Sequence, residues 1–128
     1  MKIVVDTSIL IDYFRGGSIG DRLFDRIEKQ KGEFFIPTIV IFELFSGKSS
    51  SNPSVALKIT NFISDFKRID LTEEVAMRAG ELHRQIGKQI SPQDYIIAAS
   101  ALELGAVVLT LNKKHFEQIP HLSLYPLQ

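Results

Sequence analysis

The sequence predicts an α/β fold in which a central, mostly parallel β-sheet is flanked by helices in a three-layer sandwich. Two short runs, residues 3–5 and 106–109, are apolar throughout and do not alternate with polar residues. Continuous runs of this length are typical of strands buried on both faces, as in a parallel sheet. Segments with helical spacing of apolar residues lie between the two runs, and strands that alternate with helices favour this architecture.

The N-terminal part predicts two helices and a second strand. A first helix begins near Thr7, and Gly16 and Gly17 separate it from a second helix. The apolar face of the second helix consists of Leu23, Phe24 and Ile27. Residues 33–36 predict a strand that a proline ends. Residues 38–45 leave two alternatives open, because their β-branched side chains suit a strand as well as a helix.

The C-terminal part predicts three more helices. Thr72 and Ser91 are each placed to cap a helix, and Pro92 stands at the first helical position with Asp94 two residues further on. Gly105 ends the last of these helices. The apolar faces of the other two consist of Val55, Ile59, Phe62, Ile63 and Phe66, and of Val75, Ala79, Leu82 and Ile86. Short strands are expected at residues 67–71 and 106–109, with an edge strand at 122–125.

The length and composition bound the class of protein. A chain of 128 residues predicts a single domain, residues 1–128, with a real hydrophobic core. Hydrophobic residues make up 45% and charged residues 23%, which is ordinary for a globular protein and argues against disorder. The chain has no cysteine, which excludes disulfides, thiolate metal sites and cysteine nucleophiles and fits the reducing cytoplasm.

Charge and hydropathy limit the partners. Fifteen Lys and Arg residues balance fifteen Asp and Glu residues, so no overall positive field attracts nucleic acid. An RNA-binding function would therefore depend on local charge or on a metal ion. No segment predicts a membrane span, because the longest nearly apolar stretch, residues 34–45, is shorter than the ~20 residues that a spanning helix needs. The N-terminus lacks the features of a signal peptide.

Three acidic residues occupy positions where a carboxylate is either costly to bury or typical of a functional site. Asp6 ends the first buried strand, at the sheet edge where open parallel sheets bind ligands, although a helix N-cap is the alternative. Glu43 interrupts an apolar run and needs a cation, a donor or an opening to solvent. A solvent-facing glutamate is its alternative. Asp94 lies in a first helical turn, where capping alone is the alternative.

Taken together, the three acids predict oxygen ligands around a hard divalent cation, Mg²⁺ or Mn²⁺. Small residues follow Asp94, so its helix can approach the sheet closely and bring this acid toward the strand ends. The histidines offer no pair with the spacing of zinc ligands. His83, His115 and His121 are therefore expected to be surface or packing residues.

The order of these motifs resembles that of PIN domains, and the chain is similar to the VapC-type toxin ribonucleases along essentially its whole length. The matching segments are Ile3-Val4-Val5-Asp6-Thr7-Ser8, Glu43, Ser91-Pro92-Gln93-Asp94-Tyr95 and Thr110-Leu111-Asn112-Lys113-Lys114-His115-Phe116. The resemblance implies a Rossmann-like sheet with an acidic cleft, and metal-dependent endonucleolytic cleavage of RNA. It also implies an antitoxin that covers the cleft, as in VapBC toxin–antitoxin pairs, and a homodimer.

By position, Asp6 and Asp94 match the metal-binding acids of the family and Glu43 matches its third acid. Many PIN domains carry a fourth acid where this chain has Asn112, which lowers the charge of the site by one and leaves open whether one or two metal ions bind. Asn112 is expected to position the metal or the phosphate. Ser8 and Thr110 are candidates to hydrogen-bond the carboxylates from behind. The candidate contacts to the RNA backbone are Arg15, Lys48, Lys113 and Lys114.

Two alternatives to a ribonuclease remain open. A catalytically inactive PIN-like module that binds RNA or protein is one, with Asn112 as the mark of a degraded site. A phosphoryl-switch or phosphatase-like domain is the other, because an acid at a strand end is followed later by Thr110 and Lys113. The paired acids of such sites are missing, since Asp6 has no acidic neighbour at positions 4, 5 or 8.

Overall fold

Four parallel strands form the centre of the structure, a computed structural model that describes residues 1–127. The strands are β1 (Lys2–Val5), β2 (Glu33–Pro37), β3 (Lys67–Ile69) and β4 (Val107–Leu109). They are arranged in the order β3-β2-β1-β4, and each neighbouring pair is parallel. The predicted α/β class is confirmed, and the four-stranded sheet is wholly parallel.

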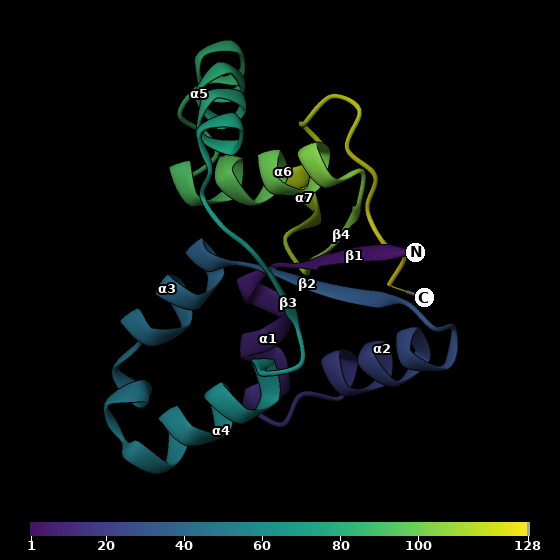
Figure 1. Ribbon diagram of the computed structural model, residues 1–128, viewed down its shortest axis with the longest axis vertical. Helices are drawn as coiled ribbons and strands as arrows, with labels where there is room; N and C mark the ends of the chain where they lie inside the picture. Colours follow the sequence, from purple (N-terminus) through teal and green to yellow (C-terminus); the bar gives the residue numbers. More distant parts are fainter. Residues whose placement is uncertain (128) are drawn as a thin grey trace.

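Helices cover both faces of this sheet (Figure 1). The helices are α1 (Thr7–Phe14), α2 (Ser18–Lys29), α3 (Thr38–Ser46), α4 (Pro53–Ile63), α5 (Glu73–Ile86), α6 (Pro92–Leu104) and α7 (Lys113–Phe116), with a 3₁₀ turn at Lys48–Ser51. In Figure 1, α5, α6 and α7 lie above the sheet, and α1, α2 and α4 lie below it. The predicted three-layer sandwich is confirmed.

The central strand β1 and helix α6 pack against each other in the core. Ile3, Val4 and Val5 are fully buried, as expected for a strand covered on both faces. Helix α6 presents small side chains that are also fully buried; they are Ala98, Ala99 and Ala101. Small residues let the helix axis approach the sheet, and this approach brings the first turn of α6 toward the carboxyl ends of the strands.

Helix α3 resolves the alternative that the sequence left open for residues 38–45. Val40 and Leu44 are buried while Phe42 and Phe45 are exposed, and this spacing is that of a helix. The helix begins directly after Pro37, the last residue of β2. The β-branched residues therefore sit in a helix because burial of one face outweighs their strand preference.

The prediction of an edge strand at residues 122–125 is wrong. This segment makes one isolated parallel bridge, between Val108 and Leu124, with hydrogen bonds from Val108 N to Ser123 O (3.0 Å) and from Tyr125 N to Val108 O (2.8 Å). The chain then turns away, and Tyr125 is buried with its hydroxyl donating to Gln30 Oε1 at 2.9 Å. Packing of Tyr125 against α2 thus replaces further pairing with β4.

The predicted helix caps are present and orient the chain at the sheet edge. Thr72 accepts a hydrogen bond from Val75 N, and Ser91 accepts one from Asp94 N. Gly105 ends α6 in the left-handed conformation at φ 71°. No helix within residues 1–127 is long and apolar enough to cross a bilayer.

Candidate active site

Asp6 lies directly after β1 and is almost completely buried, at 2% exposure. It occupies the N-cap position of α1, yet its side chain does not cap the helix. Instead, its Oδ2 accepts hydrogen bonds from Ser8 Oγ and from Thr110 Oγ1, each at 2.7 Å. Capping is therefore not the role of this carboxylate, which is oriented by hydroxyl groups from two parts of the chain.

The same two hydroxyl groups also fix the loop after β4. Ser8 Oγ accepts a hydrogen bond from Leu111 N at 2.9 Å, and Thr110 Oγ1 accepts one from Asn112 N at 2.8 Å. The two hydroxyl oxygens lie 3.3 Å apart. The buried carboxylate and the loop that follows β4 are thus one hydrogen-bonded unit, and Ser8 and Thr110 form bonds of the kind expected from their positions.

Glu43 lies on α3 and faces the N-terminus of α1. Thr7 Oγ1 donates a hydrogen bond to its Oε1 at 2.7 Å. Burial raises the pKa of Glu43, the Thr7 bond opposes this shift, and the charges of Asp6 and Asp94 raise the pKa further. Glu43 is thus half-buried and close enough to the other two carboxylates for their charges to act on it. No pattern in the sequence indicated the hydrogen bond from Thr7 to Glu43.

Asp94 lies in the first turn of α6 and is 8% exposed. Its Oδ2 is 2.9 Å from Nδ1 of His115 on α7. Burial raises the pKa of Asp94, the bond with His115 opposes this shift, and the charge of Asp6 raises the pKa further. Ser91 caps the helix by accepting a hydrogen bond from the Asp94 backbone N–H. The Asp94 carboxylate is not used for capping and contacts His115 on α7.

The expectation of a surface histidine holds for His115, whose side chain is 45% exposed, but it misses a contact that the ring makes. The ring lies against the carboxylate of Asp94, a contact that the sequence did not predict. Twenty-one residues separate His115 from Asp94, and only the return of the chain onto α6 brings them together. The expectation holds for the other two histidines, because His83 packs its ring against Tyr95 and His121 is exposed.

The three carboxylates interact with one another, and their donor set suits a hard cation. The charge of Asp6 acts on both Glu43 and Asp94. Within residues 1–127, no group of three or more acidic or histidine side chains is close enough, as placed, to enclose an ion. Mg²⁺ keeps several of its waters and needs only one or two direct carboxylates. Buried oxygens that repel one another therefore fit a hydrated divalent cation.

The residues around the carboxylates differ in how they border the site. Asn112 is exposed and lines a hollow of about 560 Å³ together with Lys113, Lys114 and His115. Its side chain makes no hydrogen bond to any of the three carboxylates within the described chain. Arg15 lines a second cavity, of about 330 Å³, together with Glu43. Both hollows are thus edged by positive charge, and the one that Arg15 lines opens beside the site acid Glu43.

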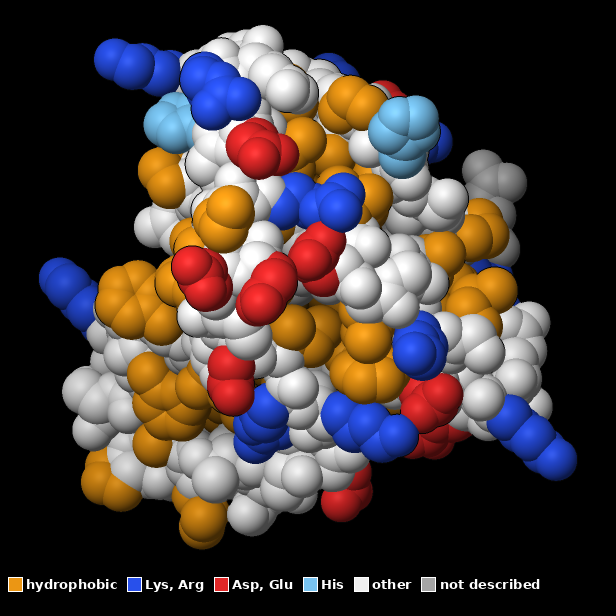
Figure 2. Space-filling model, turned by 45° about the horizontal axis from the view of Figure 1, so that its top comes forward, with side chains coloured by type: hydrophobic (Ala, Val, Ile, Leu, Met, Phe, Trp, Pro, Cys, Tyr) orange, Lys and Arg blue, Asp and Glu red, His pale blue; other side chains and the backbone are white. Residues whose placement is uncertain are grey.

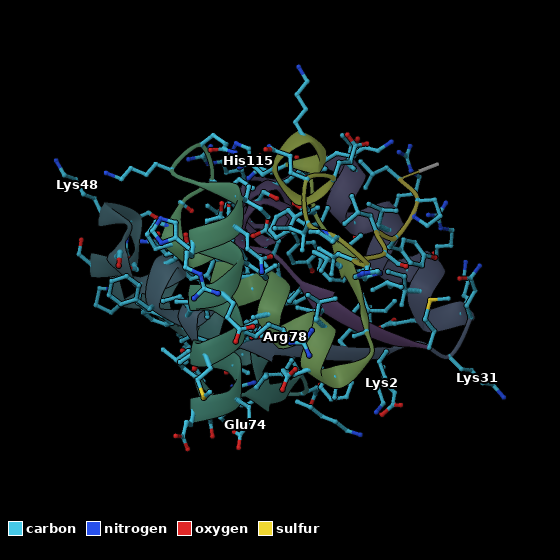
Figure 3. The ribbon with its side chains drawn as sticks, turned by 90° about the horizontal axis from the view of Figure 1, so that it is seen from above. Lys2, Lys31, Lys48, Glu74, Arg78 and His115 are labelled. Carbon is cyan, nitrogen blue, oxygen red and sulfur yellow. The ribbon has the colours of Figure 1, made fainter. Side chains whose placement is uncertain are left out.

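Lys48 does not share this position. Figure 3 shows it extending from the edge of the molecule, well apart from His115, and it lines neither hollow. Figure 2 shows Lys and Arg side chains interspersed with acidic ones, in keeping with a net charge of zero. Of the four basic candidates, Arg15, Lys113 and Lys114 are the ones that border the site.

A larger cavity formed by the described residues lies elsewhere. It has a volume of about 630 Å³ and is lined by residues of α2 and α4 and by Glu33 and Lys67, the first residues of β2 and β3. The carboxylates lie at the other end of the parallel strands. Size therefore does not locate the site, since the chemistry lies where the carboxyl ends of the strands meet.

Comparison with known proteins agrees with this fold. The family described as PIN domain matches residues 3–122. This chain belongs to the PIN-domain family. The PIN-domain chain is 33% identical over 126 residues to Ribonuclease VapC1 of Methanocaldococcus jannaschii, covering 96% of this chain and 85% of the relative. It is 31% identical over 125 residues to Ribonuclease VapC19 of Mycobacterium tuberculosis, and the match covers 95% of this chain and 97% of the relative. The resemblance to VapC-type proteins is thus confirmed.

A solved structure supports the same relationship. The VapBC2 complex of Rickettsia felis, bound to a DNA fragment from its promoter, contains a chain that superposes on this PIN domain with a TM-score of 0.84. The two chains are 27% identical, and the match covers 98% of each. The PIN-domain fold is therefore shared over nearly the entire chain.

Proposed function

We propose that this PIN-domain protein is a divalent-metal-dependent endoribonuclease and the toxin of a VapBC-type toxin–antitoxin pair. The observation that carries the proposal is the approach of Asp6, Glu43 and Asp94 from three different elements. They come from the end of β1, from α3 and from α6, and their charges act on one another. The relatives named ribonucleases support hydrolysis of RNA as the reaction.

Asp6 and Asp94 are the residues that would hold Mg²⁺ or Mn²⁺, because they are the most buried of the three acids. When bound, such an ion lowers the pKa of a coordinated water and neutralises phosphate charge. Glu43 would hold a second ion, orient the water or accept its proton. Ser8, Thr110 and Thr7 keep the carboxylates oriented through the hydrogen bonds described above.

The charge of the site explains why we expect strict metal dependence. Three nearby carboxylates repel one another and repel the phosphates of RNA. The chain as a whole is neutral and supplies no compensating field. Arg15, Lys113 and Lys114 border the two hollows and would contact the RNA backbone, and Asn112 would position the metal or the phosphate from the rim. These contacts bring the substrate to the site, where the cation neutralises it.

An exposed apolar surface supports a protein partner. Phe42 on α3 is 61% exposed and Leu57 on α4 is also 61% exposed. Figure 2 shows hydrophobic side chains gathered on the left of the molecule, the side on which Figure 1 places α3 and α4. Exposed apolar patches of this kind mark interaction sites. We propose a VapB-like antitoxin and a second copy of the chain as partners, in the cytoplasm where RNA is accessible.

The test is incubation of the purified protein with total cellular RNA, with Mg²⁺ or with a chelator, followed by mapping of the cut ends. Discrete cuts that need the cation support the proposal. RNA that stays intact in both conditions while remaining bound to the protein would identify an inactive binding module. Cleavage that persists in the chelator would contradict the metal dependence.

The essential control uses Asp6→Asn and Asp94→Asn. Both substitutions keep the size of the side chain and remove its charge, so the fold is expected to remain. We expect both to abolish cleavage, and full activity in either would refute the role given to that carboxylate. Circular dichroism of the variants separates loss of chemistry from loss of structure.

A further inference from the structure

The segment that follows β4 contacts two of the site carboxylates. Thr110 at its start donates to Asp6 Oδ2 at 2.7 Å, and His115 near its end lies 2.9 Å from Asp94 Oδ2. Asp6 belongs to the β1–α1 junction and Asp94 to α6. Residues 110–116 therefore span the two acids that are the proposed ligands of the cation.

The chemistry of the contact fixes the role of each atom. With Asp94 ionised, its carboxylate only accepts hydrogen bonds, so the His115 tautomer that makes this bond carries its proton on Nδ1 and donates a hydrogen bond to Oδ2. With Oδ2 engaged, Oδ1 is the oxygen of Asp94 that remains for a cation. The bond therefore selects one orientation of the carboxylate among those that the side chain can adopt.

The position of His115 is itself fixed. The next residue, Phe116, is 1% exposed and anchors the short helix α7 against the core. Within the turn, the backbone N–H of His115 donates a hydrogen bond to Asn112 O at 3.1 Å. Since the neighbouring side chain is buried and the turn is hydrogen-bonded, the backbone that carries the partly exposed imidazole is fixed.

We propose that His115 is a positioning residue that orients Asp94 for the divalent cation, so that residues 110–116 set the geometry of Asp6 and Asp94 together. This inference rests on the proposed metal site. It differs from a direct catalytic role, because His115 acts through Asp94. The contribution of a hydrogen-bond donor to a metal-ligating side chain is measurable as metal affinity, independently of RNA cleavage.

The test is a calorimetric titration of the protein with Mn²⁺ in the absence of RNA. His115→Phe keeps a planar ring and removes the donor, and we expect it to weaken Mn²⁺ binding by on the order of 10- to 100-fold. His115→Asn places an amide N–H near the position of Nδ1, and we expect it to restore binding close to that of the unchanged protein. Cleavage activity should follow the same order.

His121→Asn is the matched control. His121 is exposed and has a positive φ of 67°, a conformation that asparagine tolerates, so the same exchange is made away from the site. We expect Mn²⁺ affinity to be unchanged. Asp94→Asn provides the reference for loss of the ligand itself.

The outcomes separate the two proposals. If the unchanged protein binds no Mn²⁺, the proposed metal site fails and this inference fails with it. If it binds Mn²⁺ and His115→Phe binds equally well, only the positioning role is overturned. Equal weakening in His115→Phe and His115→Asn also overturns it, because the donor is then not the cause.

A second measurement needs no variant. Nitrogen-15 spectra of the histidine rings report which ring nitrogen carries the proton. At mildly alkaline pH we expect Nδ1 of His115 to be protonated, as the bond to Asp94 requires. A bare Nδ1 under these conditions would overturn the inference even if His115→Phe failed to fold.

Discussion

The hydroxyl group of Thr110 donates to the buried Oδ2 of Asp6 at 2.7 Å, which joins two residues 104 positions apart in the chain. Parallel pairing of β1 with β4 makes this contact, because Val5 lies opposite Leu109 and the next residues of both strands emerge at the same sheet edge. The bond orients a carboxylate that has little contact with water. It therefore connects the topology of the sheet directly to the chemistry of the site.

Thr110→Val tests this connection. Valine keeps the shape of threonine but removes the donor to Asp6 and the acceptor of Asn112 N. We expect a loss of about 1–3 kcal/mol in the free energy of unfolding and at least about tenfold weaker Mn²⁺ binding. Urea unfolding and calorimetry measure the two effects. Thr60→Val, on an exposed part of α4, is the control, and equal effects in both variants would contradict the assignment.

Glu43→Gln is expected to stabilise the metal-free protein while it impairs cleavage. Burial and the charges of Asp6 and Asp94 raise the pKa of Glu43, so the ionised form is disfavoured in the folded state. Glutamine removes the charge and keeps an oxygen to accept the Thr7 hydrogen bond. Because water screens a half-buried group, we expect a gain of about 0.5–1 kcal/mol at neutral pH in a chelator.

The pH dependence of this gain has a definite sign. As the pH rises past the ordinary value of 4.5, the unfolded glutamate loses its proton before the folded one does. Stability of the unchanged protein therefore falls over the interval between the two pKa values and stays lower above it. Thermal unfolding of both proteins across this range should show a difference that grows with pH and then levels off. A difference that shrinks as pH rises would contradict the account, and exposed Glu28→Gln should show neither effect.

Addition of Mn²⁺ is expected to stabilise the fold. A cation that binds only the folded state at a hundredfold its Kd adds about 2.7 kcal/mol. The relief of repulsion among Asp6, Glu43 and Asp94 gives the physical reason. Differential scanning calorimetry with Mn²⁺ or chelator measures the effect. Asp6→Asn should lose most of the gain, and an undiminished gain in that variant would place the ion elsewhere.

Arg15→Gln is expected to weaken RNA binding more than it slows the cleavage step. Arg15 borders the same cavity as Glu43 but contacts none of the carboxylates through an ion pair. We expect a higher KM with kcat little changed, and a slope of log affinity against log salt smaller by about 0.7. Lys2→Gln is the control, since Lys2 begins β1 at the far end of the strand from Asp6. Equal effects of the two substitutions would contradict a local role for Arg15.

The elements whose patterns are local were predictable from the sequence. Residues 3–5 and 106–109 are apolar runs bounded by polar or small residues, and they form β1 and β4 as expected. Ser91 and Pro92 begin α6 for reasons contained within one helical turn. The placement of Asp6 and Asp94 at the carboxyl ends follows from these two facts and from parallel topology.

The remaining features depend on contacts that no local pattern contains. Residues 38–45 are apolar at nearly every position, so only burial of Val40 and Leu44 identifies the helix. Residues 122–125 have the composition of a strand, but packing of Tyr125 against α2 limits pairing to one bridge. The contact of His115 with Asp94 arises from the return of the chain after β4 and has no signal in either segment.

The central claim is that Asp6 and Asp94 share a divalent cation. Anomalous diffraction from crystals of the protein grown with Mn²⁺ tests it most directly. We expect a strong peak about 2.1 Å from one carboxylate oxygen of each residue, with Glu43 within reach of a water on the ion. A crystal with Mn²⁺ bound elsewhere, or with no peak between these two carboxylates at saturating Mn²⁺, would contradict it.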